Sequence, residues 1–134
     1  MGVTIRLTRK QIEPLTAVNP MLFQRTHPET GTFVLYSLLE TPEANGSTGD
    51  ETCYSCQLNL SWPVCGRDDE IPAMGSERAA KLKKLGQPLV EPYRTAFMLI
   101  PDDANVTTTR LPLSVSHRIV RGSVSRWGIP IVMP

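Results

Sequence analysis

Two cysteines at the spacing Cys-x-x-Cys, Cys53 and Cys56, have the most obvious potential for chemistry in this sequence. In redox and zinc sites this spacing lies on a turn or at a helix N-terminus, where the two sulfurs come together. Here the pair falls in a pattern typical of a strand, where residues three apart face opposite sides of the sheet. Cys65 adds a third sulfur, but no fourth ligand has matching spacing. We therefore interpret the cysteines as unpaired structural thiols.

The histidines and the acidic clusters give no catalytic arrangement either. His27 lies in a turn and His117 in the C-terminal tail, and neither has a nucleophile and an orienting acid at a readable spacing. The runs 68–70 and 102–103 are acidic, but they lack further acidic residues at metal-ligand spacing. Neither GxGxxG nor GxxxxGK[ST] occurs. We therefore predict no catalytic, cofactor-binding or metal-binding residue.

A row of neutral polar side chains is the strongest candidate for ligand binding. Between residues 53 and 62, apolar and polar residues alternate without a break, which predicts an antiparallel strand with one buried and one polar face. The buried face would carry Tyr54, Cys56, Leu58, Leu60 and Trp62, and the polar face Ser55, Gln57, Asn59 and Ser61. Hydrogen-bonding groups on a sheet face can line a ligand pocket in a larger enzyme. The alternative is a face turned to water.

The segments around this strand predict how it is supported. Alternation over residues 3–8 indicates a first strand, and Thr8 can cap a helix through residue 18. Residues 21–24 and 32–39 flank a Pro- and Gly-containing turn and predict a hairpin, whose second strand is apolar on both faces and therefore central. Helical spacing predicts helices over 76–85 and 89–100, and a β-branched run predicts a strand over 106–111. The fold class is α+β, with a mostly antiparallel β-sheet and three short helices.

Composition and charge exclude several function classes. The 134 residues carry 14 Lys and Arg against 13 Asp and Glu, a formal charge of +1 with both signs scattered. This balance argues against a nucleic-acid surface and a polybasic membrane anchor. No apolar run approaches the roughly 18 residues of a membrane helix, and residues 1–8 do not resemble a signal peptide. We expect an intracellular, cytoplasmic protein.

Several stretches together carry a family resemblance. They are residues 2–15, 23–31 and 58–63, followed in the same order by residues 91–94 and 100–103. In this order and spacing the chain resembles the substrate-domain portion of fungal FAD-dependent monooxygenases, the group similar to aromatic-ring hydroxylases. The resemblance covers about residues 2–111. It implies a substrate-domain-like segment over 1–111 and a divergent, weakly structured tail over 112–134.

The resemblance also implies a function for the sheet. In that family this segment covers an organic substrate above the flavin, between a Rossmann-like FAD domain and a later Gly-Asp box. Both cofactor boxes are missing here, so FAD belongs to the full-length family and none is expected on this chain alone. The substrate-face candidates are Tyr36, Gln57, Asn59 and Ser61, expected on one face with Val34 and Leu38. With nothing to cover it, that face is expected to self-associate or to bind an FAD-domain partner.

Three hypotheses follow from these observations. The chain is a partial or truncated monooxygenase from fungal secondary metabolism, the part that covers a small organic substrate. Alternatively, it is a free-standing, non-redox metabolite-binding or cyclase/isomerase-like domain derived from that part. The third hypothesis is an accessory subunit of a separately encoded FAD domain. The sequence leaves open whether the chain is an enzyme by itself.

Overall fold

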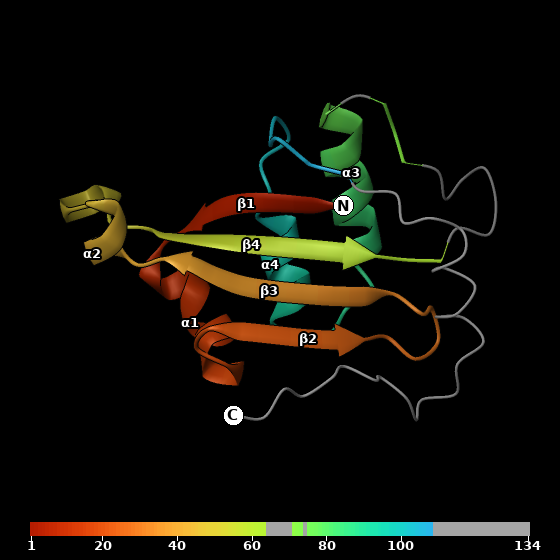
Figure 1. The fold of residues 1–134 in the computed structure, drawn as a ribbon, viewed down its shortest axis with the longest axis horizontal. Helices are drawn as coiled ribbons and strands as arrows, with labels where there is room; N and C mark the ends of the chain where they lie inside the picture. The colour runs from red at the N-terminus through yellow and green to blue at the C-terminus, as the bar shows by residue number, and fades with distance from the viewer. Residues whose placement is uncertain (64–70, 74, 109–134) are drawn as a thin grey trace, which may run out of the picture.

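The structure, a computed structural model, describes residues 1–63, 71–73 and 75–108. Its sheet contains four antiparallel strands in the order β1-β4-β3-β2 (Figure 1). The strands are β1 (Gly2–Leu7), β2 (Leu22–Thr26), β3 (Phe33–Glu40) and β4 (Tyr54–Ser61). The α+β class, the β2–β3 hairpin and the central position of β3 are confirmed.

Three helices support the sheet, and local signals explain their ends. Helix α1 (Arg9–Val18) begins with a capping box, in which the Thr8 and Gln11 side chains satisfy each other's backbone N–H groups. Helix α3 spans Gly75–Gly86, and α4 spans only Tyr93–Met98. The prediction of a helix from residue 89 was therefore wrong at its start. Pro92 lacks an N–H and disfavours a helical conformation at the preceding residue, so the helix begins after it.

The polar segment between β3 and β4 contains short regular structure. Helix α2 (Pro42–Asn45) has a proline in its first turn, where the missing N–H costs no hydrogen bond. It ends at Gly46, whose positive φ of 73° suits a residue without a Cβ. A 3₁₀ turn over Gly49–Glu51 follows. These elements connect the two central strands at one end of the sheet (Figure 1).

The core lies between the sheet and the helices, which cover one of its two faces (Figure 1). The apolar positions of the β1 and β4 alternation are buried there, except that Tyr54 and Trp62 pack against the core while partly exposed. The helices contribute a second apolar layer to the same cluster, made of Ile12, Leu15, Ala79, Leu82, Tyr93, Ala96 and Phe97. The predicted buried side of β4 is thus confirmed.

The outer edge of β1 is paired at one place among the described residues. Gly2 and Thr107 exchange two backbone hydrogen bonds of 2.9 and 2.8 Å in an isolated antiparallel bridge. The rest of the predicted strand from residue 109, and the predicted tail over 112–134, lie outside the described residues. Cys65, His117 and the acidic run 68–70 also lie outside them. Within the described ranges, none of the helices combines the length and the apolarity needed to cross a bilayer.

Candidate functional site

The sheet face opposite the helices is the candidate site, and we call it the open face. Strand register assigns its members, because residues paired across antiparallel strands project to the same side. The register gives four cross-strand rows. The first row contains Arg6, Ser55 and Glu40, and the second contains Thr4, Gln57, Ser37 and Leu22. The third row contains Gly2, Asn59, Leu35 and Gln24, and the fourth contains Ser61, Phe33 and Thr26. None of the described helices or strands covers this face, which Figure 1 views directly.

The predicted polar row of β4 runs through the middle of the open face. Gln57 and Asn59 are partly exposed and Ser61 is exposed. The Gln57 Nε2 donates a hydrogen bond of 3.3 Å to Asn59 Oδ1. Asn59 also lies directly over Gly2, where an added Cβ would stand 2.1 Å from Asn59 Oδ1. The glycine in β1 therefore makes room for this amide.

Charge is confined to one end of the open face. Ser55 is buried and its Oγ donates a hydrogen bond of 3.0 Å to Glu40 Oε2, in the row that also contains Arg6. The rows of Gln57, Asn59 and Ser61 contain only uncharged residues. The centre of the face is therefore neutral, with polar groups on β4 beside the apolar Leu35 and Phe33 of β3.

The structure corrects the predicted position of Tyr36 on the substrate face. It pairs with Leu58 and Phe23 on the helix-covered face and is fully buried, so it does not share a face with Gln57, Asn59 and Ser61. Its predicted neighbours on β3 follow it to that side, since Val34 pairs with Leu60 and Leu38 with Cys56. A shift of one residue in register exchanges the faces of a strand, and β3 is apolar at both sets of positions. The substrate role of Gln57, Asn59 and Ser61 stays a prediction.

Tyr36 instead belongs to a buried cluster with Cys56 and Tyr93. Burial raises the pKa of Tyr36 and Tyr93, and it raises the pKa of the Cys56 thiol to about 11. The Tyr93 ring stacks on Phe23 at 4.8 Å between centroids and an interplanar angle of 17°. All three titratable groups are therefore protonated at neutral pH, and their surroundings are those of a packed core.

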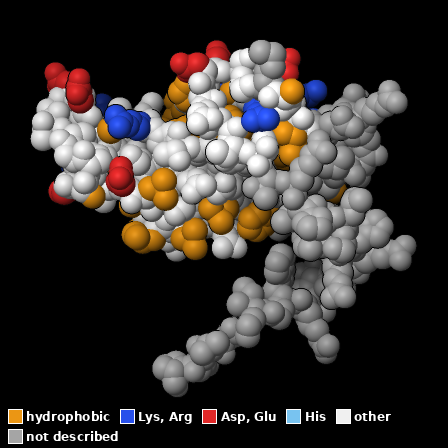
Figure 2. Space-filling view, turned by 45° about the horizontal axis from the view of Figure 1, so that its top comes forward, with side chains coloured by type: hydrophobic (Ala, Val, Ile, Leu, Met, Phe, Trp, Pro, Cys, Tyr) orange, Lys and Arg blue, Asp and Glu red, His pale blue; other side chains and the backbone are white. Residues whose placement is uncertain are grey.

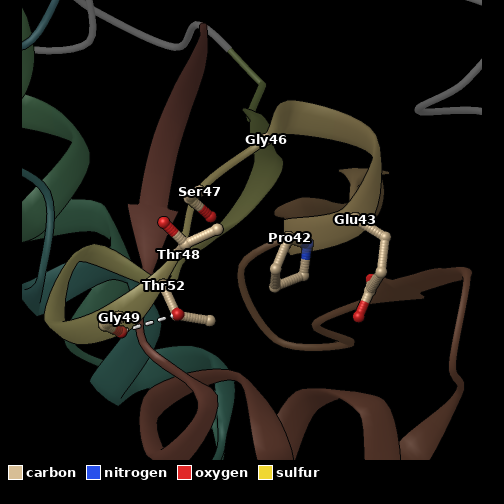
Figure 3. A pocket seen from close by; sticks show the side chains of 7 residues that line it. All are labelled: Pro42, Glu43, Gly46, Ser47, Thr48, Gly49 and Thr52. Carbon is tan, nitrogen blue, oxygen red and sulfur yellow. Dashed lines mark hydrogen bonds between the residues drawn. The ribbon is translucent and has the colours of Figure 1, made fainter.

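A concavity lies between α2 and the 3₁₀ turn, with a volume of about 440 Å³ (Figure 3). Its polar groups serve the loop itself. Thr52 Oγ donates to the Gly49 carbonyl at 2.7 Å, and Ser47 Oγ accepts from the Cys53 N–H at 3.0 Å. The Asn45 amide, at the foot of this loop, donates to the Cys53 carbonyl at 2.9 Å. No set of convergent reactive groups faces this hollow among its lining residues, so it is not the candidate site.

The start of α1 does not fit an FAD pyrophosphate. Such a group binds free backbone N–H groups at a helix N-terminus that follows a glycine-rich turn. At the start of α1 the Gln11 N–H donates to Thr8 Oγ at 3.4 Å, and the Thr8 N–H donates to Gln11 Oε1 at 2.9 Å. The described glycines with positive φ, Gly31, Gly46 and Gly49, lie in other turns. The described residues also contain no group of three metal-ligating side chains.

Comparison with known proteins gives this geometry a context. The chain is 34% identical to the FAD-dependent monooxygenase dbaB of Emericella nidulans over 112 residues. These residues are 83% of this chain and 28% of that protein. It is 30% identical to a probable FAD-dependent monooxygenase of Arthroderma benhamiae over 108 residues. These residues are 77% of this chain and 24% of that protein. This chain is similar to a segment of fungal FAD-dependent monooxygenases.

The chain spans about a quarter of the length of these curated monooxygenase relatives. No family model matches it. No solved structure matches it significantly. The similarity supports the predicted kinship with FAD-dependent monooxygenases.

Sequence reasoning missed Gly2 as a residue of the candidate site. The predicted first strand began at Val3 and did not include Gly2, yet Gly2 lies under the Asn59 amide. A glycine in a strand can signal close approach of another group. The partner could not be named without the β1–β4 register, which places Gly2 opposite Asn59.

Proposed function

We propose that this chain is the part of an FAD-dependent monooxygenase that covers an organic substrate above the flavin, with the open face turned to the substrate. The observation that carries the proposal is the contrast between the two sheet faces. One is buried under helices, and the other presents neutral polar and apolar side chains with no described element over it. The similarity to segments of FAD-dependent monooxygenases supplies the class of reaction.

The side chains of the open face suit a small organic molecule. Gln57, Asn59 and Ser61 offer hydrogen bonds in a row, and the neighbouring Leu35 and Phe33 offer apolar surface. Ligand sites commonly combine apolar walls with a few fixed polar groups, because the first supply affinity and the second supply orientation. In this proposal the chain binds the substrate and keeps water from it.

The flavin in this proposal is held by other parts of a monooxygenase. The start of α1 is closed by its own capping side chains, so this helix offers no anion cradle. The chain therefore acts either as a segment of a longer protein or as a subunit beside an FAD domain. A free-standing, non-redox metabolite-binding domain is the competing function.

A chimera tests the proposal. The 112 matched residues of the Emericella nidulans relative would be replaced by those of this chain. We expect the chimera to keep bound flavin and monooxygenase activity. The triple variant Gln57→Ala, Asn59→Ala and Ser61→Ala should lower activity at least about tenfold while flavin absorbance stays unchanged, because each lost hydrogen bond costs about 1 kcal/mol.

A matched control lies outside the sheet. Gln87→Ala removes an exposed neutral amide between α3 and α4, and activity should be unaffected. A chimera that keeps flavin and activity but tolerates the triple variant would refute the open face as the substrate side. A chimera without flavin, together with tight binding of a metabolite by the 134-residue chain alone, would favour the free-standing domain.

A further inference from the structure

The Gln57 and Asn59 side chains lie next to each other on β4 and are already joined by a hydrogen bond. We infer that they form a preset donor–acceptor pair that selects a neutral substrate group with an acceptor and a donor side by side, such as the edge of a lactam or carboxamide. The inference rests on the proposed function, because it takes the open face as the side that meets the substrate. It adds the chemical class that this face recognises.

The existing hydrogen bond decides which atoms remain for a ligand. Gln57 Nε2 donates to Asn59 Oδ1, so Asn59 presents its Nδ2 as a donor and Gln57 presents its Oε1 as an acceptor. Neither Asn59 Nδ2 nor Gln57 Oε1 makes a hydrogen bond within the described part of the chain. Residues two apart on a strand project from the same face about 7 Å apart at the backbone, so a single planar group can reach both side chains.

Gly2 holds this pair in place. The missing Cβ at Gly2 lets the Asn59 amide lie against the β1 backbone, where a methyl group would come within 2.1 Å of Oδ1. The Gly2 backbone is itself fixed by the bridge to Thr107, whose Oγ donates to the Gly2 carbonyl at 3.1 Å. A side chain that is ordered before binding loses less entropy on binding, which favours recognition by this amide pair.

The surroundings favour a neutral ligand over a charged one. The Gln57 and Asn59 rows hold Thr4, Ser37 and Leu35 but no charged residue, and the adjoining Ser55 row holds one charge of each sign, Glu40 and Arg6. A carboxylate placed here would meet the Gln57 carbonyl oxygen and no cation in its own rows. An apolar ring would instead lie over Leu35, with its polar edge on the amides.

The test is a titration of the ¹⁵N-labelled 134-residue chain with 2-quinolone, followed by NMR. The side-chain NH₂ signals are assigned with Gln57→Glu and Asn59→Asp. We expect 2-quinolone to shift the Asn59 and Gln57 side-chain signals most. N-methyl-2-quinolone, which lacks the donor, and quinoline-2-carboxylate, which is charged, should each bind at least about fivefold more weakly.

Two variants and a control complete the experiment. Asn59→Asp replaces the donor by an acceptor and should weaken 2-quinolone binding about fivefold, and Gly2→Ala should do the same by displacing an intact Asn59. Gln87→Ala, which removes an exposed amide between α3 and α4 and away from the open face, should leave binding unchanged. If all three probes shift the Leu35 and Phe33 backbone signals equally, the amide pair does not select and only this inference fails. If no open-face signal moves with any probe, the inference is also overturned, and the chimera decides the proposed function separately.

Discussion

The hydroxyl groups of Tyr36 and Tyr93 are buried and make no hydrogen bond of standard geometry among the described residues, and the weakly polar Cys56 thiol is a neighbour of Tyr36. Burying an unpaired hydroxyl costs free energy, because its hydrogen bond to water is lost and not replaced. Tyr36 is fully buried between β3 and the helices, so the cost there is not relieved by solvent. Its aromatic ring, by contrast, contributes to the packing of the core.

Replacing Tyr36 by Phe should therefore leave the free energy of unfolding unchanged or raise it by up to about 1 kcal/mol. The ring and its packing stay in place, and only the unpaired hydroxyl is removed. Urea unfolding of the two proteins measures the difference. The matched variant Tyr36→Ala should lower stability by about 3–5 kcal/mol, since it leaves a cavity. A clear loss in Tyr36→Phe would mean that the hydroxyl has a stabilising partner, such as the Cys56 thiol.

Cys56 predicts how stability depends on alkaline pH. Burial raises the pKa of its thiol from an ordinary value of 9.0 to about 11 in the folded chain. Between these pH values the folded state binds more protons than the unfolded state, so the free energy of unfolding falls as the pH rises. This contribution is fully present below pH 9 and is lost as the pH rises toward 11.

Urea unfolding at pH 8 and pH 10 checks this prediction. We expect the decrease in stability to be smaller in Cys56→Ala than in the unmodified chain. Cys53→Ala is the control, because Cys53 is only partly buried and should leave the decrease unchanged. Equal decreases in all three proteins would show that the Cys56 thiol is not the group that titrates.

At the scale of elements, Gly86 is where α3 packs closely against α4. It is the last residue of α3 and is buried, and an added Cβ would stand 2.5 Å from Phe97 Cβ in α4. Because that atom is close to the backbone, it cannot move without shifting the helix. The close contact of the two helices therefore depends on a glycine at this position.

Gly86→Ala should lower the free energy of unfolding by about 1–3 kcal/mol, the usual cost of forcing extra atoms into a packed core. Gly75→Ala, at the other end of the same helix, is the matched control. A Cβ there meets no atom within 4 Å, so this variant should be neutral or slightly stabilising. Thermal unfolding followed by circular dichroism compares the two. Equal stability of both variants would contradict the packing of α3 on α4.

At the scale of the whole molecule, the open face predicts self-association. From the sequence, self-association was expected through an exposed patch of Val34, Tyr36 and Leu38. These residues lie on the helix-covered side, so the apolar surface of the open face comes from other residues. Leu22 is 46% exposed and lies on the open face with the partly exposed Leu35. Figure 2 shows hydrophobic side chains gathered along the lower margin of the described part, the side where Figure 1 places β2.

Sedimentation velocity at several concentrations should detect oligomers of the 134-residue chain. The double variant Leu22→Lys and Leu35→Lys should shift the population toward monomer, because it places charge on the apolar part of the open face. Val90→Lys is the control, since Val90 is equally exposed at 46% but lies between α3 and α4. A monomer at all concentrations would contradict this prediction and favour a free-standing domain.

Much of this fold was predictable because the signals are local. The alternation of Tyr54 to Trp62 predicts β4 and its buried side, and Thr8 predicts the start of α1. The neutral polar row at Gln57, Asn59 and Ser61 was also readable, since the residues of one strand face share a fixed period. The sequence alone determined these elements, the α+β class and the resemblance to FAD-dependent monooxygenases.

Only the tertiary structure decided which strands' residues share a face. β3 is apolar at both sets of positions, so its own pattern could not choose between burying Tyr36 and burying Leu35. The pairing of Tyr36 with Leu58, and of Gly2 with Asn59, results from contacts between residues far apart in the chain. Register is set by such distant packing together with turn geometry, and it moves every side chain of a strand at once. For that physical reason the sequence could name the polar row, while the structure was needed to show which residues lie beside it.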